Sequence, residues 1–114
     1  MRILVVEDES VIAQDIAWIV ENEAGYSVAG IASTVDEALA IIAKGELDGA
    51  ILDANLDGES SEKIAKELKQ KNVPFFILSG YLAQKKLPPT LAGARFLQKP
   101  YSERDLLQNL HSLK

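Results

Sequence analysis

Short, uninterrupted runs of apolar residues recur along this chain, and they constrain its fold more than any other feature. The clearest runs are residues 3–6, 50–52 and 75–78, while residues 28–32 and 94–97 form weaker ones. The clear runs do not alternate apolar with polar residues, so each is typical of a strand covered on both faces, as in a parallel sheet. The spacing therefore predicts five strands in one buried sheet.

Between these runs the apolar residues follow a helical spacing. Capping-box patterns at residues 34–37 and 102–105 indicate two helix starts. Strand and helix alternate five times, which predicts an α/β fold with a doubly wound parallel sheet and right-handed crossovers. The exception is residues 82–92, where Pro88 and Pro89 leave room for only a short or irregular fourth helix. The expected helices are marked by Ile12, Ile16, Ile19 and Val20; by Val35, Ala38, Leu39, Ile42 and Ala43; by Ile64, Ala65 and Leu68; and by Leu106, Leu107, Leu110 and Leu113.

Composition narrows the class of protein. A length of 114 residues predicts one stand-alone domain over residues 1–114. The formal charge of −5, without a basic run, argues against nucleic-acid binding. The absence of cysteine excludes thiol catalysis, and a single His111 excludes a histidine-rich metal site. No apolar stretch is long enough to span a membrane, so we expect a cytoplasmic protein without a membrane partner.

Polar residues follow four of the predicted strands. The acids at 7–9 follow the first, Asp53 the third, Ser79 the fourth and Lys99 the fifth. Open α/β sheets bind their ligands at the carboxyl ends of strands, so these residues could share one crevice. Asp8 and Asp53 at adjacent strand ends would repel each other unless a cation lay between them, and oxygen ligands favour Mg²⁺. The main-chain carbonyl of Asn55, shortly after Asp53, could supply another ligand.

This combination is suited to moving a phosphoryl group. Asp53 would be the nucleophile, Lys99 would neutralise charge on the transferred group, and Ser79 would hydrogen-bond one of its oxygens. Each residue alone also has an ordinary interpretation, because an acid after a strand often caps a helix, an aspartate often lies in a turn, and Lys-Pro often lies in a loop. The ordered set is what is specific.

That ordered set resembles the receiver domain of two-component response regulators over essentially the whole chain. The resemblance implies a flavodoxin-like (βα)₅ sheet of strand order 2-1-3-4-5. It implies that Glu7 and Asp8 are the acidic pair that binds Mg²⁺ with Asp53, and that Asp53 accepts the phosphoryl group. It makes Ser79 the switch hydroxyl and Lys99 the amine that faces the phosphate.

The stretches 53–59, 74–81 and 97–101 resemble more narrowly a single-domain subgroup named for its Phe-Ala-Thr-Gly-Tyr sequence, whose fourth helix is also atypical. Glu7 stands where aspartate is commoner, and Ser79 where threonine is commoner. Phe96 takes the place of the switch aromatic, often tyrosine, so it lacks the hydroxyl. The interval from Ser79 to Lys99 is shorter than usual. Tyr81, two residues past Ser79, could shield the phosphoryl group from water.

Val11 and Trp18 lie away from the apolar stripe of the first predicted helix. They could form an exposed apolar patch there, where receivers resembling this one meet their kinase. Alternatively, Trp18 tucks against the second strand or the last helix.

The resemblance implies a phosphorelay protein that receives phosphate from a histidine kinase or a histidine phosphotransfer protein and acts on a downstream protein. It would not be an enzyme with a separate substrate. Three other classes of protein share part of this pattern. A phosphatase with an aspartyl nucleophile shares the Asp, Ser, Lys and Mg²⁺ set, but carries its nucleophile after the first strand. A docking module independent of phosphorylation would not need the complete site. A flavin binder is disfavoured by the acids at 7–9, which occupy the loop that would hold a phosphate.

Overall fold

The computed structural model describes residues 1–56, 59–79 and 95–113. The expectation of a short fourth helix at residues 82–92, and the shielding role expected of Tyr81, lie outside these residues. Within the described part, no helix combines the length and the apolar character that crossing a membrane requires.

Five parallel strands form the central sheet, in the order β2-β1-β3-β6-β7. This is the predicted 2-1-3-4-5 order, with β6 and β7 as the fourth and fifth strands of the main sheet. Each strand extends the predicted apolar run by no more than one residue at either end. The bounds are β1 Arg2–Val6, β2 Ser27–Ala32, β3 Gly49–Asp53, β6 Phe75–Ser79 and β7 Arg95–Gln98.

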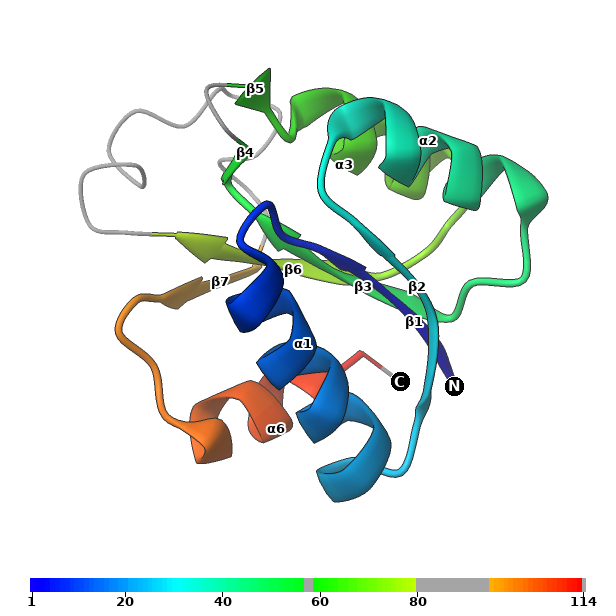
Figure 1. The fold of residues 1–114 in the computed structure, drawn as a ribbon. Helices are drawn as coiled ribbons and strands as arrows, with labels where there is room; N and C mark the ends of the chain where they lie inside the picture. The colour runs from blue at the N-terminus through cyan, green and yellow to red at the C-terminus, as the bar shows by residue number, and fades with distance from the viewer. Residues whose placement is uncertain (57–58, 80–94, 114) are drawn as a thin grey trace.

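Helices cover both faces of this sheet, as the doubly wound topology requires (Figure 1). Helices α1 (Ser10–Trp18) and α6 (Glu103–His111) lie on one face, and α2 (Val35–Lys44) and α3 (Glu62–Gln70) lie on the other. Alternate residues of each strand enter the two cores. In β1, for example, Ile3 and Val5 pack with α1 and α6, whereas Leu4 and Val6 pack with α2 and α3. The buried runs therefore lack polar residues because both strand faces are covered.

The two predicted capping boxes differ in outcome. At α6 the box is complete, because Ser102 Oγ accepts from the Asp105 amide and an Asp105 carboxylate oxygen accepts from the Ser102 amide. At α2 only half of it forms. Thr34 Oγ1 accepts from the Glu37 amide at 3.1 Å, but the Glu37 carboxylate accepts from the amide and hydroxyl of Ser33 instead of from the Thr34 amide. The preceding hydroxyl offers a second donor, so the carboxylate makes two hydrogen bonds there.

Three local features differ from the predicted pattern. A π-helical turn, η1 (Ile19–Glu23), continues α1. Two short antiparallel strands, β4 (Asn55–Leu56) and β5 (Glu59–Ser60), follow β3. Helix α6 ends at His111, so Leu113 lies beyond the helix although its side chain is buried in the core.

The core should respond far more strongly than the surface to loss of side-chain volume. Ile51 is fully buried in the central strand β3, and Val11 is 70% exposed on α1. We expect Ile51→Ala to lower the free energy of unfolding by about 2–5 kcal/mol. Val11→Ala should stay within about 0.5 kcal/mol of wild type. Urea unfolding of both variants tests this, and equal losses would contradict the described packing.

Candidate phosphoryl-transfer site

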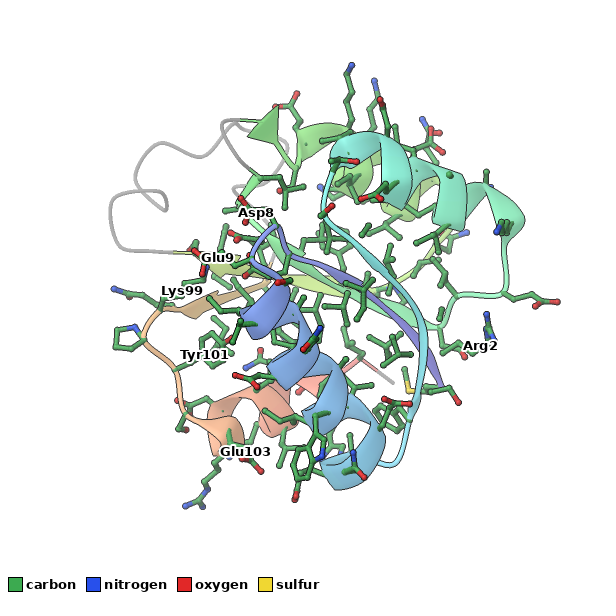
Figure 2. All side chains as sticks on the ribbon, in the orientation of Figure 1. Arg2, Asp8, Glu9, Lys99, Tyr101 and Glu103 are labelled. Atoms are coloured by element: carbon green, nitrogen blue, oxygen red, sulfur yellow. The ribbon has the colours of Figure 1, made fainter. Side chains whose placement is uncertain are left out.

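The strand register brings the acids at 7–8 and Asp53 to one end of the sheet. Strands β1 and β3 pair with Val6 opposite Leu52, so Glu7 and Asp53 each come one residue later at neighbouring positions. Asp8 then leads into α1. Figure 2 shows Asp8 and Lys99 at this end of the sheet, with Arg2 at the opposite end of β1. The predicted crevice therefore lies at the carboxyl ends of the strands.

Three carboxylates meet in this crevice. Glu7, Asp8 and Asp53 each offer one oxygen, and these oxygens all lie within 4.8 Å of one another. Glu7 and Asp53 are buried, and Asp8 is half-buried. Oxygen donors this close to one another fit a hard divalent cation such as Mg²⁺. Asn55, the other predicted ligand, lies two residues beyond Asp53 in β4.

Lys99 reaches the carboxylates from the end of β7. Its Nζ lies 3.4 Å from Asp53 Oδ2 and 3.8 Å from Glu7 Oε1, and its side chain is 34% exposed. The Lys99 amide also donates to the Ser79 carbonyl at 2.8 Å, which fixes the backbone after β7 against the end of β6. The ammonium therefore offsets part of the negative charge in the crevice.

Ser79 ends β6, beside Asp53. Strand β6 pairs with β3 so that Leu78 lies opposite Asp53. Ser79 is buried, and its Oγ has no hydrogen-bond partner among the described residues. Buried hydroxyls normally find partners, so this one is suited to a ligand oxygen. The structure thus brings Glu7, Asp8, Asp53, Ser79 and Lys99 to the same end of the sheet.

Burial dominates the electrostatics of Glu7. Removal from water, together with hydrogen bonding to the carboxyl of Asp53, raises the pKa of Glu7 from 4.5 to about 8, although a hydrogen bond from the Glu9 amide opposes the shift. Without a cation, the protonated form of Glu7 is therefore favoured well above the usual range of a glutamate. Ionising all three carboxylates at once costs free energy through mutual repulsion, and added positive charge lowers that cost.

The remaining predicted residues lie near the site or on the surface. Phe96 is half-buried in β7, opposite Ile77 of β6, and packs against the core shared with α2 and α3. Val11 is 70% exposed and Trp18 is 53% exposed, so both present apolar surface to solvent on α1. The single histidine, His111, contacts the ring of Tyr26 edge-on with centroids 6.1 Å apart.

Tyr101 was not predicted as a site residue. It follows Lys99 by two positions and lines a groove with Lys99, Ile12 and Ile16. Its pKa is raised by burial and by the nearby charges of Glu7 and Asp53. Only its place directly after the Lys99-Pro100 pair could have indicated this position from the sequence.

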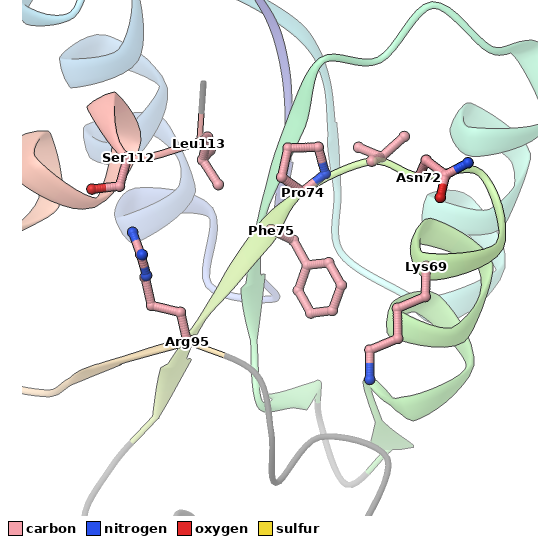
Figure 3. A pocket seen from close by; sticks show the side chains of 8 residues that line it. Lys69, Asn72, Pro74, Phe75, Arg95, Ser112 and Leu113 are labelled. Atoms are coloured by element: carbon pink, nitrogen blue, oxygen red, sulfur yellow. The ribbon is translucent and has the colours of Figure 1, made fainter.

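A separate cavity lies away from this chemistry. Figure 3 shows this cavity of about 440 Å³ near the start of β6, where it is lined by Lys69, Phe75, Arg95 and neighbouring residues. It contains none of the predicted site residues. The candidate site is therefore the acidic crevice and not this cavity.

The raised pKa of Glu7 predicts how the metal-free protein depends on pH. The folded protein keeps a proton on Glu7 that the unfolded chain releases above about pH 4.5. The contribution of Glu7 to the free energy of unfolding is therefore complete below that pH and is lost as the pH rises through about 8. In chelator, Glu7→Gln should therefore lose less stability than wild type between about pH 5 and about pH 8.5, with a difference of a few kcal/mol.

Urea unfolding at both pH values measures this difference. The matched control is Glu9→Gln, which removes an exposed charge from the same loop and should follow wild type. Parallel pH dependence in wild type and Glu7→Gln would contradict the assignment.

Comparison with known proteins supports one family. A family model for the response regulator receiver domain matches residues 3–111. The sensory transduction protein LytT of Bacillus anthracis is 28% identical over 116 aligned positions, which cover 100% of this chain and 47% of that protein. The transcriptional regulatory protein PdtaR of Mycobacterium tuberculosis is 31% identical, with 93% of this chain and 53% of that protein covered. The chain thus spans about half the length of these curated relatives.

Among solved structures, the solution structure of SdrG from Sphingomonas melonis Fr1 superimposes with a TM-score of 0.84 and 32% identity. The match covers 99% of this chain and 95% of SdrG. Together with the family match, the strand order and the gathered acids, this similarity shows that the chain belongs to the response regulator receiver domain family.

Proposed function

We propose that this chain is the phosphoacceptor of a two-component phosphorelay and receives a phosphoryl group on Asp53. Receiver domains generally act as signalling modules, and the family implies a phosphodonor such as a histidine kinase. One observation carries the proposal: Asp53 lies 3.4 Å from Lys99 Nζ, within a cluster of carboxylates and beside the buried hydroxyl of Ser79. The donor would be a phosphohistidine on a histidine kinase or a histidine phosphotransfer protein.

The transfer uses this chain's own side chains in distinct roles. An Asp53 carboxylate oxygen attacks phosphorus, the phosphorus–nitrogen bond breaks, and the donor imidazole leaves with the bonding electrons. The ammonium of Lys99 balances charge on the phosphoryl oxygens, and Ser79 Oγ donates a hydrogen bond to one of them. Lys99 Nζ already lies 3.4 Å from Asp53 Oδ2, and the Ser79 hydroxyl has no partner among the described residues, so both groups are free to meet that charge.

The acidic cluster would hold Mg²⁺ through Glu7, Asp8 and Asp53, with the main-chain carbonyl of Asn55 as a further ligand. The ion, when bound, screens the carboxylates from one another and coordinates phosphoryl oxygens. Asp8 would help to hold the ion, and Glu7 would bind it as the carboxylate, with its proton lost to solvent. The oxygen spacing of at most 4.8 Å supports this role.

The response to phosphorylation would start at Ser79 and Phe96. Ser79 would move toward the phosphoryl group, and Phe96 would follow by repacking, because it has no hydroxyl to hydrogen-bond. Tyr81 would shield the phosphoryl group from the attacking water. Comparing the rate of dephosphorylation in Tyr81→Ala with that in wild type tests the shielding, and an unchanged rate would exclude it.

The kinase would dock on the exposed apolar residues of α1. Val11 and Trp18 are seven residues apart, so they lie on the same side of the helix, and both are exposed. Exposed apolar groups of this size favour a protein partner. Slower phosphotransfer to Trp18→Ala at limiting concentration, with an unchanged rate at saturation, would support the docking role.

We further propose that the protein works as a stand-alone, single-domain regulator in the cytoplasm, without an activity on a separate substrate. The match to 95% of SdrG supports the single-domain organisation. The downstream protein would be recognised after phosphorylation, or phosphate would be relayed onward. The mass of the native gene product tests the single-domain organisation, and the cellular fraction in which it is found tests the cytoplasmic location.

Asp53 should be the sole phosphorylated residue. With a phosphorylated histidine kinase of the source organism and Mg²⁺, Asp53→Asn should show no transferred label, because an amide cannot accept the phosphoryl group. Asp36→Asn, an exposed change on α2, should be labelled like wild type. Undiminished labelling of Asp53→Asn would exclude the proposed phosphoacceptor.

Mg²⁺ should stabilise the folded protein, because a ligand that binds only the native state adds RT ln(1 + [L]/Kd) to the free energy of unfolding. At a free Mg²⁺ concentration of about ten times Kd this gain is about 1.4 kcal/mol, which is measurable as a rise in Tm. Asp8→Ala should abolish the rise, and Glu9→Gln should retain it. An unchanged Tm of wild type on addition of Mg²⁺ would contradict an ion shared by Asp8 and Asp53.

A further inference from the structure

The two edges of the sheet differ in how they are protected against pairing. Strand β7 begins with Arg95 and is followed by Lys99 and Pro100, and charges and proline at an edge discourage addition of another strand. Strand β2, at the other edge, carries neither. Residues 27–34, which read Ser-Val-Ala-Gly-Ile-Ala-Ser-Thr, contain no charge and no proline in a chain of which 25% is charged. Edge β2 therefore lacks these two safeguards, although its pairing with β1 contains a register shift between Ile3 and Leu4.

The backbone of Ile31 faces away from the sheet. The Ala32 carbonyl accepts from the Glu7 amide of β1's continuation at 2.9 Å, so the polar backbone groups of Ala32 point into the sheet. Successive residues of a strand direct these groups to opposite sides. The Ile31 N–H and C=O therefore point outward, along the edge where β1 is absent.

The side chain of Ile31 makes the same edge apolar. Ile31 pairs with Val5 of β1, so its side chain lies on the sheet face that α1 and α6 cover. It remains 44% exposed, because β2 is the outermost strand on that side. In Figure 1, β2 runs along the near side of the molecule. An outward-facing amide, an outward-facing carbonyl and an exposed β-branched side chain therefore coincide at one residue.

We propose that β2 pairs with β2 of a second copy of this chain, antiparallel, about a two-fold axis at Ile31. In that arrangement the two Ile31 residues exchange both N–H···O=C hydrogen bonds and their side chains pack across the junction. The two five-stranded sheets become one continuous sheet.

A second copy is favoured over an unrelated extended peptide for two reasons. A two-fold axis makes the edge complementary to itself, so donors and acceptors match without a further sequence requirement. The absence of charge over residues 27–34 also means that self-pairing brings no like charges together at the junction. The net charge of −5 on each copy opposes association at longer range, so added salt should strengthen the dimer.

Sedimentation velocity on the full chain tests the pairing without any phosphodonor, so it is independent of the proposed phosphorelay function. We expect a reversible monomer–dimer equilibrium that shifts toward dimer with protein concentration and with salt. Ile31→Lys should weaken the dimer at least ~10-fold, because it places two like charges opposite each other. Gln108→Lys adds the same charge to α6, which contacts β7 at the other edge, and should dimerise like wild type.

Amide hydrogen exchange identifies the face used and does not depend on a variant that folds. Exchange at the Ile31 amide of wild type should slow as the dimer fraction rises, while the Gln98 amide in β7 stays unchanged. A chain that stays monomeric throughout the series would overturn the proposal. A dimer in which the exchange rate of the Ile31 amide does not change with protein concentration would also overturn it. The same holds if Ile31→Lys and Gln108→Lys change the dissociation constant of the dimer equally. Protection of Ile31 only when an extended peptide is added would assign the edge to a peptide partner instead.

Discussion

Repulsion among buried carboxylates is the interaction on which the site depends. At a separation near 5 Å and an effective dielectric constant of about 20, two such charges repel by roughly 3 kcal/mol. Glu7 and Asp53 cannot move apart, because each directly follows paired residues of the central strands β1 and β3. The cost is relieved only by a proton on Glu7, by the ammonium of Lys99, or by an added cation. A rigid sheet thus keeps the site ready for added positive charge.

The sheet and the placing of the polar residues at its strand ends could be predicted, because both depend on apolar runs that are clear in the local sequence. Apolar runs such as 75–78 have no other reasonable position than a covered strand, and Asp53 and Ser79 end such runs directly. Shorter features carry no comparable signal. Strands β4 and β5 have two residues each, too few for a periodicity, and the π-helical turn η1 continues an ordinary helical spacing. The two hydrogen bonds that Ser33 donates to the Glu37 carboxylate could not be predicted, because the sequence does not show which neighbouring donors the carboxylate meets.

Exposure was harder to predict than position. A helical wheel places Trp18 away from the apolar stripe, but only the packed structure shows that no described neighbour covers it fully. Strand β2 is similar. The run at 28–32 is a weak strand signal because it includes Ala29 and Gly30. This composition is sufficient for β2 because β2 is an edge strand, with one neighbouring strand and less buried surface to fill.

The open edge and the acidic crevice share a backbone contact. Ile31 directly precedes Ala32, and the Ala32 carbonyl holds the Glu7 amide at 2.9 Å. Pairing at β2 would therefore fix the strand that positions the first acid of the site. If phosphorylation at Asp53 changed the affinity between two copies, pairing would change the stability of the phosphorylated form by the same factor, because such coupling is reciprocal. The parallel register that gathers the carboxylates thereby also links them to the one edge of the sheet that lacks charge and proline.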